Sequence, residues 1–307
     1  MTKPLIFIVG PTGVGKSDAG FLLAQFIDGE IVNADAMSVY QGVDIASDKP
    51  SKEVLQQIPH HLFDVVALTE NFNVAQYRVL AIAAIEAIIK RGKTPIVVGG
   101  SGMYVTVLLD GIFERQARDN NVRDALMAEA KEKGLQVLHA RLGTLDPKAA
   151  AKIHPNDMRR IVRALEVAMT TGEPISDLQP QRQGLWGQMP IRIFGLNRPR
   201  EVLYQRVEAR VEAMIAKGLV EEIRGLSHLP ISQTAGYLIG IPETLGFLKG
   251  EYDLEQLKYL MKLHTRHLVK NQLTWFLRDK RIEWLKLEND TKPTSIAETL
   301  TSKLGKA

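Results

Sequence analysis

The chain has 307 residues, of which 45% are hydrophobic and 24% are charged, so wholesale disorder is excluded. A length of this order predicts two domains, or one domain that carries an insertion. The absence of cysteine excludes disulfides, thiolate nucleophiles and cysteine-ligated metal centres, and a net charge of +4 permits a polyanionic partner without arguing for one. The sequence shows neither a run of roughly 18 apolar residues nor the features of a signal peptide, so we expect a cytoplasmic protein with no membrane segment.

The first third of the chain alternates apolar strands with amphipathic helices. Strands are expected at Pro4–Gly10, Glu30–Ala34 and Thr94–Val98, and helices at Ser17–Ile27 and Gln76–Lys90. Strands that are apolar throughout and are separated by helices indicate a parallel sheet covered on both faces. We therefore expect an α/β fold.

The pattern changes at about residue 114, where helical stretches follow one another without a strand between them. The later elements are expected as helices at Val122–Gly134, Leu135–Gly143 and Asp157–Thr171, a connector at Glu173–Pro190, a strand at Pro190–Leu196, helices at Glu201–Lys217 and Leu254–Leu277, and a strand at Ile282–Leu287. This order predicts an α/β core formed by residues 1–113 and 191–307, interrupted by a helical insertion at 114–190.

A phosphate-binding loop joins the first strand to the first helix. Its residues are Gly10, Pro11, Thr12, Gly13, Val14, Gly15, Lys16 and Ser17, which fit the pattern GxxxxGK[ST] in full. In such a loop backbone N–H groups surround a diphosphate, the lysine adds a positive charge, and the hydroxyl of Ser17 can bind Mg²⁺. The motif predicts a P-loop NTPase-like sheet with a diphosphate-bearing ligand, and it does not identify that ligand as ATP.

Two polar residues are expected beside this loop. Asp35 follows the second strand and Ser101 follows the third, and ligands of open α/β sheets bind at the carboxyl ends of the strands. Asp35 could act as a general base or a metal ligand, or could simply cap the following segment. From the residues alone the chain is a transferase or a kinase with a diphosphate donor.

Several longer segments, in the same order along the chain, resemble one family, the tRNA dimethylallyltransferases (tRNA isopentenyltransferases). They include the phosphate loop and the stretches NADAMSVYQGVDIASDKPS, PIVVGGSGMYV, IHPNDMRRIVRALEV and TRHLVKNQLTWF, and the resemblance covers about residues 4 to 280. The phosphate loop alone is common to many families, including ATP-binding ones. The combination of the phosphate loop with the other segments is highly specific for the tRNA dimethylallyltransferase family.

The resemblance implies transfer of a dimethylallyl group from dimethylallyl diphosphate to the exocyclic amine (N6) of the adenosine next to the tRNA anticodon, on its 3′ side. Asp35 matches the family's general base, and Ser101 stands where the family usually has threonine. Lys16, Arg210 and Mg²⁺ at Ser17 would stabilise the leaving diphosphate.

The resemblance also implies a tRNA-binding role for the insertion, which would grip the anticodon arm. The implied tRNA-binding residues are Asp35, Ala36, Met37, Ser38 and Ser101 in the core, and Arg123, Arg159, Arg160, Ile161, Val162 and Arg163 in the insertion. The target base is stacked in the anticodon loop, so it has to leave the stack to reach Asp35. A channel that admits the base from one side and the diphosphate from the other suits this reaction.

Some positions depart from the family pattern. Ala36 and Ser38 lie in a segment that is commonly Asp-Ser-x-Gln, Asn271 stands at a position that is often arginine, and Ala46-Ser47-Asp48 replaces Gly-Thr-Ala. The catalytic set is retained, so we interpret the chain as an active enzyme.

A basic stripe is expected on the helix at Leu254–Leu277, where Lys258, Lys262, Arg266 and Lys270 recur every four residues. We expect this stripe to contact tRNA phosphates unless it is simply a solvated face, and we expect a monomer. Three alternatives stay open: a P-loop small-molecule kinase, a transferase that prenylates free adenine nucleotides, and a non-catalytic RNA-binding protein.

Overall fold

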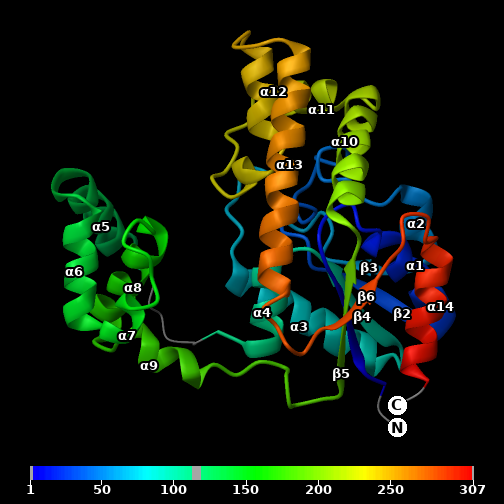
Figure 1. Cartoon of the computed structure of the whole chain (residues 1–307), viewed down its shortest axis with the longest axis horizontal. Helices are drawn as coiled ribbons and strands as arrows, with labels where there is room; N and C mark the ends of the chain where they lie inside the picture. The colour runs from blue at the N-terminus through cyan, green and yellow to red at the C-terminus, as the bar shows by residue number, and fades with distance from the viewer. Residues whose placement is uncertain (1–2, 113–118, 306–307) are drawn as a thin grey trace. The chain divides into compact units, whose positions relative to one another are not determined.

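The structure is a computed structural model that describes residues 3–112 and 119–305, and it divides into two compact units. The larger unit contains residues 1–109 and 186–307, and the smaller contains residues 110–185. The expected first boundary, between residues 113 and 114, lies outside the described residues. Figure 1 shows the course of the chain through both units, which are described separately below.

The larger unit is built on a six-stranded sheet in which every neighbouring pair of strands is parallel, with the order β3-β2-β4-β1-β5-β6. The strands are β1 (Leu5–Val9), β2 (Gly29–Asn33), β3 (His60–His61), β4 (Thr94–Gly99), β5 (Ile191–Asn197) and β6 (Glu283–Lys286). The predicted parallel α/β sheet is confirmed. The sequence pattern did not predict β3, because a two-residue strand has no periodicity to detect.

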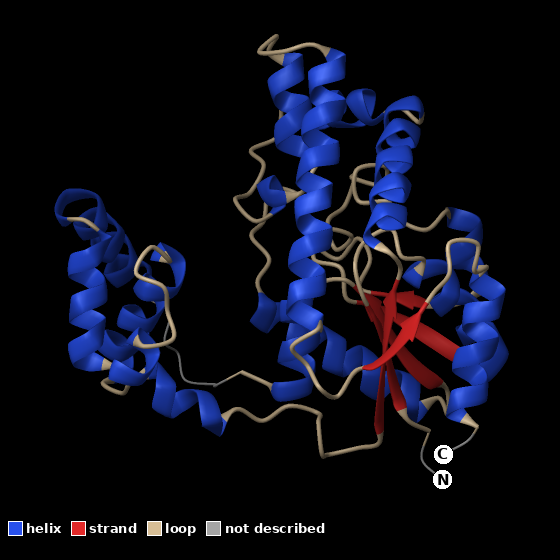
Figure 2. Cartoon of the chain, in the orientation of Figure 1, coloured by secondary structure: helices blue, strands red, loops and turns tan. Residues whose placement is uncertain are grey.

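Both faces of the sheet are buried. Ile6 and Ile8 of β1 belong to an apolar core that also contains Leu23 and Leu300, and Phe7, which points to the opposite face, is fully buried as well. Figure 2 shows the strands (red) flanked by helices (blue). The described helices of this unit are α1 (Lys16–Ile27), α2 (Lys52–Gln57), α3 (Val74–Lys90), α4 (Gly102–Asp110), α10 (Arg200–Ala216), α11 (Leu219–Leu226), α12 (Ile241–Leu248), α13 (Leu254–Phe276) and α14 (Pro293–Leu304), with a 3-10 turn at Ala235–Tyr237.

Local sequence explains where several of these elements begin. Asn73 caps α3, because its side chain accepts from the backbone N–H of Gln76 while the Gln76 side chain accepts from the N–H of Asn73. Asp253 caps the long helix α13 in a similar way, by accepting from the N–H of Gln256. Helix α13 packs against α10, and helix α14 packs against α1. These contacts bring the last third of the chain against the phosphate loop.

The described residues of the smaller unit form helices joined by loops, with no strand among them. It contains α5 (Asn120–Lys133), α6 (Leu135–Leu145), α7 (Pro147–Ala150), α8 (Met158–Thr171) and α9 (Ile175–Leu178), followed by a 3-10 turn at Gln179–Gln181. Its core is formed by apolar side chains of α5, α6 and α8, including Leu126, Leu142 and Leu165. The segment expected as a connector therefore contains two short helical turns. No helix within the described residues is long and apolar enough to cross a membrane.

Candidate active site

The phosphate loop wraps around the end of β1 as the sequence predicts. Gly10 has a φ of 141° and approaches β5 so closely that a Cβ atom there would lie 2.4 Å from the carbonyl oxygen of Leu196. Gly15 has a φ of 101° at the start of α1. Glycine is required at Gly10 for both reasons, since other residues rarely adopt this backbone conformation and none has room for its side chain.

Lys16 is the buried cation of this loop. Its side chain is 9% exposed, and its Nζ donates a hydrogen bond of 2.7 Å to the carbonyl oxygen of Pro11. Burial lowers the pKa of Lys16 to about 8, the nearby Asp35 carboxylate acts in the opposite direction, and Arg210 adds to the lowering. A bound diphosphate would stabilise the charged form of this amine.

Asp35 follows β2 and is held by its neighbours. Its backbone N–H donates to Oδ1 of Asn33 (2.9 Å), and its own Oδ1 accepts from the N–H of Met37 (2.8 Å). The N–H of Ser101 donates to the carbonyl oxygen of Ala34 (3.0 Å), which ties the end of β4 to the end of β2. The structure thus brings Asp35 and Ser101 to one edge of the sheet.

Two cavities of the larger unit meet at Asp35. One, of about 330 Å³, is mainly apolar, and its lining includes Met37, Met214, Met261 and Trp275 together with Ser101. The other, of about 990 Å³, is lined by the phosphate loop and contains Lys16 and Ser17. The residues that line both cavities are Thr12, Asp35, Ser47, Asp48, Gly100, Arg210 and Gln272. Asp35 and Arg210 can therefore be reached from both cavities.

Arg210 projects from α10 toward the junction of the cavities. Its Nη1 pairs with Oδ2 of Asp48 at 3.1 Å, and its buried Nε has no hydrogen-bond partner among the described residues. One turn earlier on the same helix, Nε of Arg206 donates to the carbonyl oxygen of Gly13 at 2.7 Å. Of the expected cations, Lys16 and Arg210 therefore lie at the phosphate loop together with Arg206.

Gln272 of α13 is a site residue that the sequence reasoning missed. Its Oε1 accepts from the N–H of Thr12 (2.8 Å), and its Nε2 donates to the carbonyl oxygen of Gly100 (2.9 Å). One side chain thus links the phosphate loop to the turn after β4, between the two cavities. The segment QLTWF contributes to the family resemblance, but nothing in its local pattern indicates that its glutamine reaches residue 12.

The residues that follow Asp35 divide between the cavities. Ala36 and Met37 line the apolar cavity, whereas Ser38 lines the phosphate-loop cavity and is only 5% exposed. Asn271, another departure from the family pattern, also lines the apolar cavity. These side chains therefore shape the walls of the two cavities next to Asp35.

In the smaller unit, a buried carboxylate organises two of the expected tRNA-binding arginines. Glu166 is fully buried and pairs with Arg163 (2.9 Å) and Arg123 (3.4 Å). Arg159 and Arg160 are exposed. Ile161 and Val162, expected as part of the same tRNA-binding segment, are 0% and 3% exposed in the apolar core of the unit. Their side chains are therefore structural, because the amphipathic helix α8 turns them inward.

The basic stripe of α13 is largely neutralised within the larger unit. Lys258 and Lys262 both pair with Glu212 of α10, at 3.4 and 2.5 Å, and Arg266 pairs with Glu208 at 3.2 Å. Only Lys270 of the four is exposed without a recorded ion pair in the described part of the chain. The other three side chains face a helix whose acids match their spacing, so this face is less open than the sequence predicts. Contact of the stripe with tRNA stays a prediction.

The cavity beside the phosphate loop has the donor atoms that Mg²⁺ prefers. The hydroxyl of Ser17 and the carboxylate of Asp18 line it, and such oxygen donors, supplemented by diphosphate oxygens, suit this ion. The described residues contain no group of three or more histidine, aspartate or glutamate side chains that would form a metal site without a ligand.

Together, the fold and the cavities define a P-loop α/β protein in which the cavity at the phosphate loop meets an apolar cavity at the carboxylate of Asp35. The sequence model of IPP transferase matches residues 38–280. The chain is 46% identical over 285 residues to a tRNA dimethylallyltransferase of Geobacter metallireducens, covering 92% of both chains. It is 41% identical over 303 residues to the enzyme of the same name from Alkaliphilus oremlandii, covering 98% of this chain and 96% of the relative.

Solved structures agree with this match. The tRNA isopentenylpyrophosphate transferase of Bacillus halodurans superposes with a TM-score of 0.71 at 35% identity, over 99% of this chain and 97% of that chain. A eukaryotic dimethylallyltransferase acting on tRNA gives a TM-score of 0.82 at 30% identity, over 97% of this chain and 77% of that chain. The chain belongs to the IPP transferase family of prenyltransferases, among the tRNA dimethylallyltransferases, and the kinase alternative is not favoured.

Proposed function

We propose that this enzyme transfers the dimethylallyl group of dimethylallyl diphosphate to N6 of the adenosine adjacent to the tRNA anticodon, on its 3′ side. The observation that carries the proposal is that Asp35 and Arg210 line both cavities. The attacking amine can therefore reach the allylic carbon where the two cavities join, while the diphosphate leaves that carbon toward the phosphate loop. Its relatives bear the names of tRNA dimethylallyltransferases, and one solved relative acts on tRNA.

The cavity at the phosphate loop takes the diphosphate. The diphosphate lies within the loop formed by Gly10, Pro11, Thr12, Gly13, Val14, Gly15, Lys16 and Ser17. The N–H groups of the loop that are not used within the protein, as that of Thr12 is by Gln272, point to the diphosphate. Lys16 and Arg210 supply positive charge as the C–O bond breaks. Mg²⁺ held at Ser17 would neutralise part of the charge that develops on the diphosphate. The loop thereby makes diphosphate a better leaving group.

The apolar cavity takes the dimethylallyl group and the adenine. Its methionine and tryptophan side chains exclude water, which would otherwise capture the activated allylic carbon. As the bond between N6 and this carbon forms, the amine loses a proton to the carboxylate of Asp35. The hydroxyl of Ser101 lines the same cavity and orients either the amine or the donor.

The smaller unit supplies the surface for the anticodon arm in this proposal. Arg159 and Arg160 are exposed on α8 and can reach phosphates directly. Arg123 and Arg163 hold Glu166, so we assign them a shared role in shaping this surface and in contacting tRNA. We further infer a monomer in the cytoplasm, where its tRNA substrate is made.

The test is transfer of label from dimethylallyl diphosphate to unmodified tRNA. The wild-type protein is expected to label tRNA, and Asp35→Asn is expected to lower the rate by about 100-fold or more at saturating substrates, because a general base is lost. Glu70→Gln is the control, since this exposed carboxylate lines neither cavity. Turnover of ATP without labelling of tRNA would contradict the proposal, and so would a normal rate for Asp35→Asn.

A further inference from the structure

Asp48 places a negative charge inside the site proposed for diphosphate. Its Oδ2 lies 3.1 Å from Nη1 of Arg210, and both residues line both cavities. The Asp48 side chain is 47% exposed and that of Arg210 is 27% exposed, so a ligand can approach the pair. A carboxylate at this position occupies one edge of the guanidinium that the diphosphate needs.

The loop that carries Asp48 is anchored on both sides. Before it, the Glu222 carboxylate of α11 accepts from the backbone N–H groups of Ile45 (2.8 Å) and Ala46 (2.9 Å). Asp48 itself has a φ of 52°, a left-handed conformation that aspartate adopts more readily than most residues. These constraints hold its carboxylate at the cavity wall.

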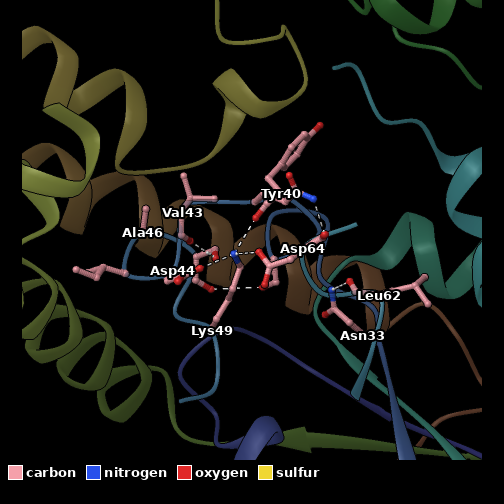
Figure 3. A network of polar contacts seen from close by, with 12 residues as sticks. Asn33, Tyr40, Val43, Asp44, Ala46, Lys49, Leu62 and Asp64 are labelled. Carbon is pink, nitrogen blue, oxygen red and sulfur yellow. Dashed lines mark hydrogen bonds and ion pairs between the residues drawn. The ribbon is translucent and has the colours of Figure 1, made fainter. Parts of the chain in front are cut away.

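After Asp48, the side chain of Lys49 forms the second anchor. It is 4% exposed, and its Nζ donates to Oδ1 of Asp44 (2.7 Å), to the carbonyl oxygen of Tyr40 (2.8 Å) and to the carboxylate of Asp64. Figure 3 shows Lys49 at the centre of this network. Because the loop is held at Ile45 and Ala46 before Asp48 and at Lys49 after it, the contact of Asp48 with Arg210 can be broken more easily by movement of the arginine than by movement of the loop.

The charge of Asp48 also reaches the phosphate loop. Burial is the main cause that raises the pKa of Asp18, Arg206 opposes the shift, and Asp48 adds to it. Arg210 in turn adds to the lowered pKa of Lys16. The charges of Asp48 and Arg210 therefore both act on groups of the phosphate loop. A diphosphate bound there would be repelled by Asp48 and would compete with Asp48 for Arg210.

We propose that Asp48 is an internal anion that competes with diphosphate for Arg210, and so weakens the binding of diphosphate and speeds its release. The inference rests on the proposed function, in which Arg210 contacts the diphosphate. When the ligand is absent, Asp48 neutralises the arginine. When diphosphate binds, the guanidinium turns its donors toward it, and the ion pair with Asp48 is weakened or lost.

Calorimetric titration of the full-length protein with inorganic diphosphate in a Mg²⁺ buffer tests this directly. Asp48→Asn keeps an oxygen acceptor for Arg210 but removes the charge, and a partly exposed ion pair of this kind corresponds to an effect of about 1.5- to 5-fold. The variant is therefore expected to bind diphosphate more tightly by that factor. Glu208→Gln is the matched control, because it removes a charge from another ion pair, with Arg266, and lines neither cavity.

A second titration in an Arg210→Gln background shows whether the effect acts through the arginine. In this background the increase in diphosphate affinity caused by Asp48→Asn is expected to be smaller. An equal increase in both backgrounds would overturn the proposal that Asp48 and diphosphate compete for Arg210. Unchanged or weaker binding by Asp48→Asn would also overturn it, including a loss seen only with Mg²⁺, which would identify a metal ligand instead. A wild-type protein that does not bind diphosphate would contradict the proposed function itself, and this inference with it.

Discussion

The lowered pKa of Lys16 makes a quantitative prediction about how diphosphate binding depends on pH. Burial lowers this pKa to about 8 in the ligand-free protein, and a bound diphosphate raises it again, because the anion favours the charged amine. Binding above this pKa must therefore take up a proton. The affinity for diphosphate is expected to be retained below about pH 8 and to fall as the pH rises through that value.

The size of the effect follows from the fraction of protein that already carries the proton. With a pKa near 8, that fraction falls from about 0.9 at pH 7 to about 0.1 at pH 9, so the dissociation constant is expected to rise about tenfold between these two conditions. The fall continues until the pH reaches the higher pKa that Lys16 has in the complex. A lysine with an ordinary pKa would give a nearly flat profile over the same range.

Calorimetric titration with inorganic diphosphate across this pH range is the assay, and Lys16→Arg is the control. Arginine keeps its charge throughout, so the variant carries the titration of the ligand and of the other side chains but not that of residue 16. The ratio of wild-type to variant dissociation constants isolates the lysine. A ratio that stays constant from pH 7 to pH 9 would refute the reasoning that burial lowers the pKa of Lys16.

Three further predictions concern residues that stabilise or position parts of one unit or the other. Gln272→Glu keeps an oxygen that accepts from the N–H of Thr12, but it replaces the donor to the carbonyl of Gly100 with a carboxylate oxygen, which that carbonyl repels. The KM for dimethylallyl diphosphate is therefore expected to rise about tenfold in steady-state assays. An unchanged KM would contradict a role of Gln272 in positioning the loop. Arg163→Ala removes one of the two arginines that pair with the buried Glu166. Because Arg123 remains, the helical unit is expected to lose about 1.5 to 3 kcal/mol in urea unfolding, and Glu166→Gln in the same chain should reduce this loss. Gly10→Ala is expected to cost several kcal/mol or prevent folding, as thermal denaturation would show, whereas Gly225→Ala, in a helix with open space around it, is expected to change stability by less than about 1 kcal/mol. Equal melting temperatures for the two alanine variants would show that the close approach of Gly10 to β5 does not require glycine at that position.

Much of the fold can be predicted from the sequence because its signals are local. The strands β1, β2 and β4 show no alternation of apolar and polar residues, and this pattern indicates a parallel sheet buried on both faces. The glycine pattern identifies the phosphate loop because only a few backbone conformations can surround a diphosphate. The position of Asp35 also follows from the chain order, since the residue after a strand of an open sheet faces the ligand edge.

Which partners the charged side chains have, by contrast, depends on contacts between segments that are distant in the sequence. The spacing of the lysines on α13 correctly places them on one face of that helix, but it carries no information about the acids of α10 that meet this face. In the same way, Arg123 and Arg163 could be assigned to tRNA on sequence grounds, while their pairing with Glu166 emerges only when α5 and α8 pack. A charge pattern in the sequence shows which side chains share one face of a helix. It does not show which other helix packs against that face.

The amino-acid sequence by itself determined the α/β class, the phosphate loop and the identity of the carboxylate beside it, because each is encoded within a short stretch of chain. Only the tertiary structure decided that two cavities share Asp35 and Arg210, and that Gln272 reaches across 260 positions to the N–H of Thr12. It also decided that Asp48, a departure from the family pattern in the sequence, stands against Arg210. These arrangements arise from the packing of α10 and α13 beside the sheet, and packing of that kind is set by the whole chain.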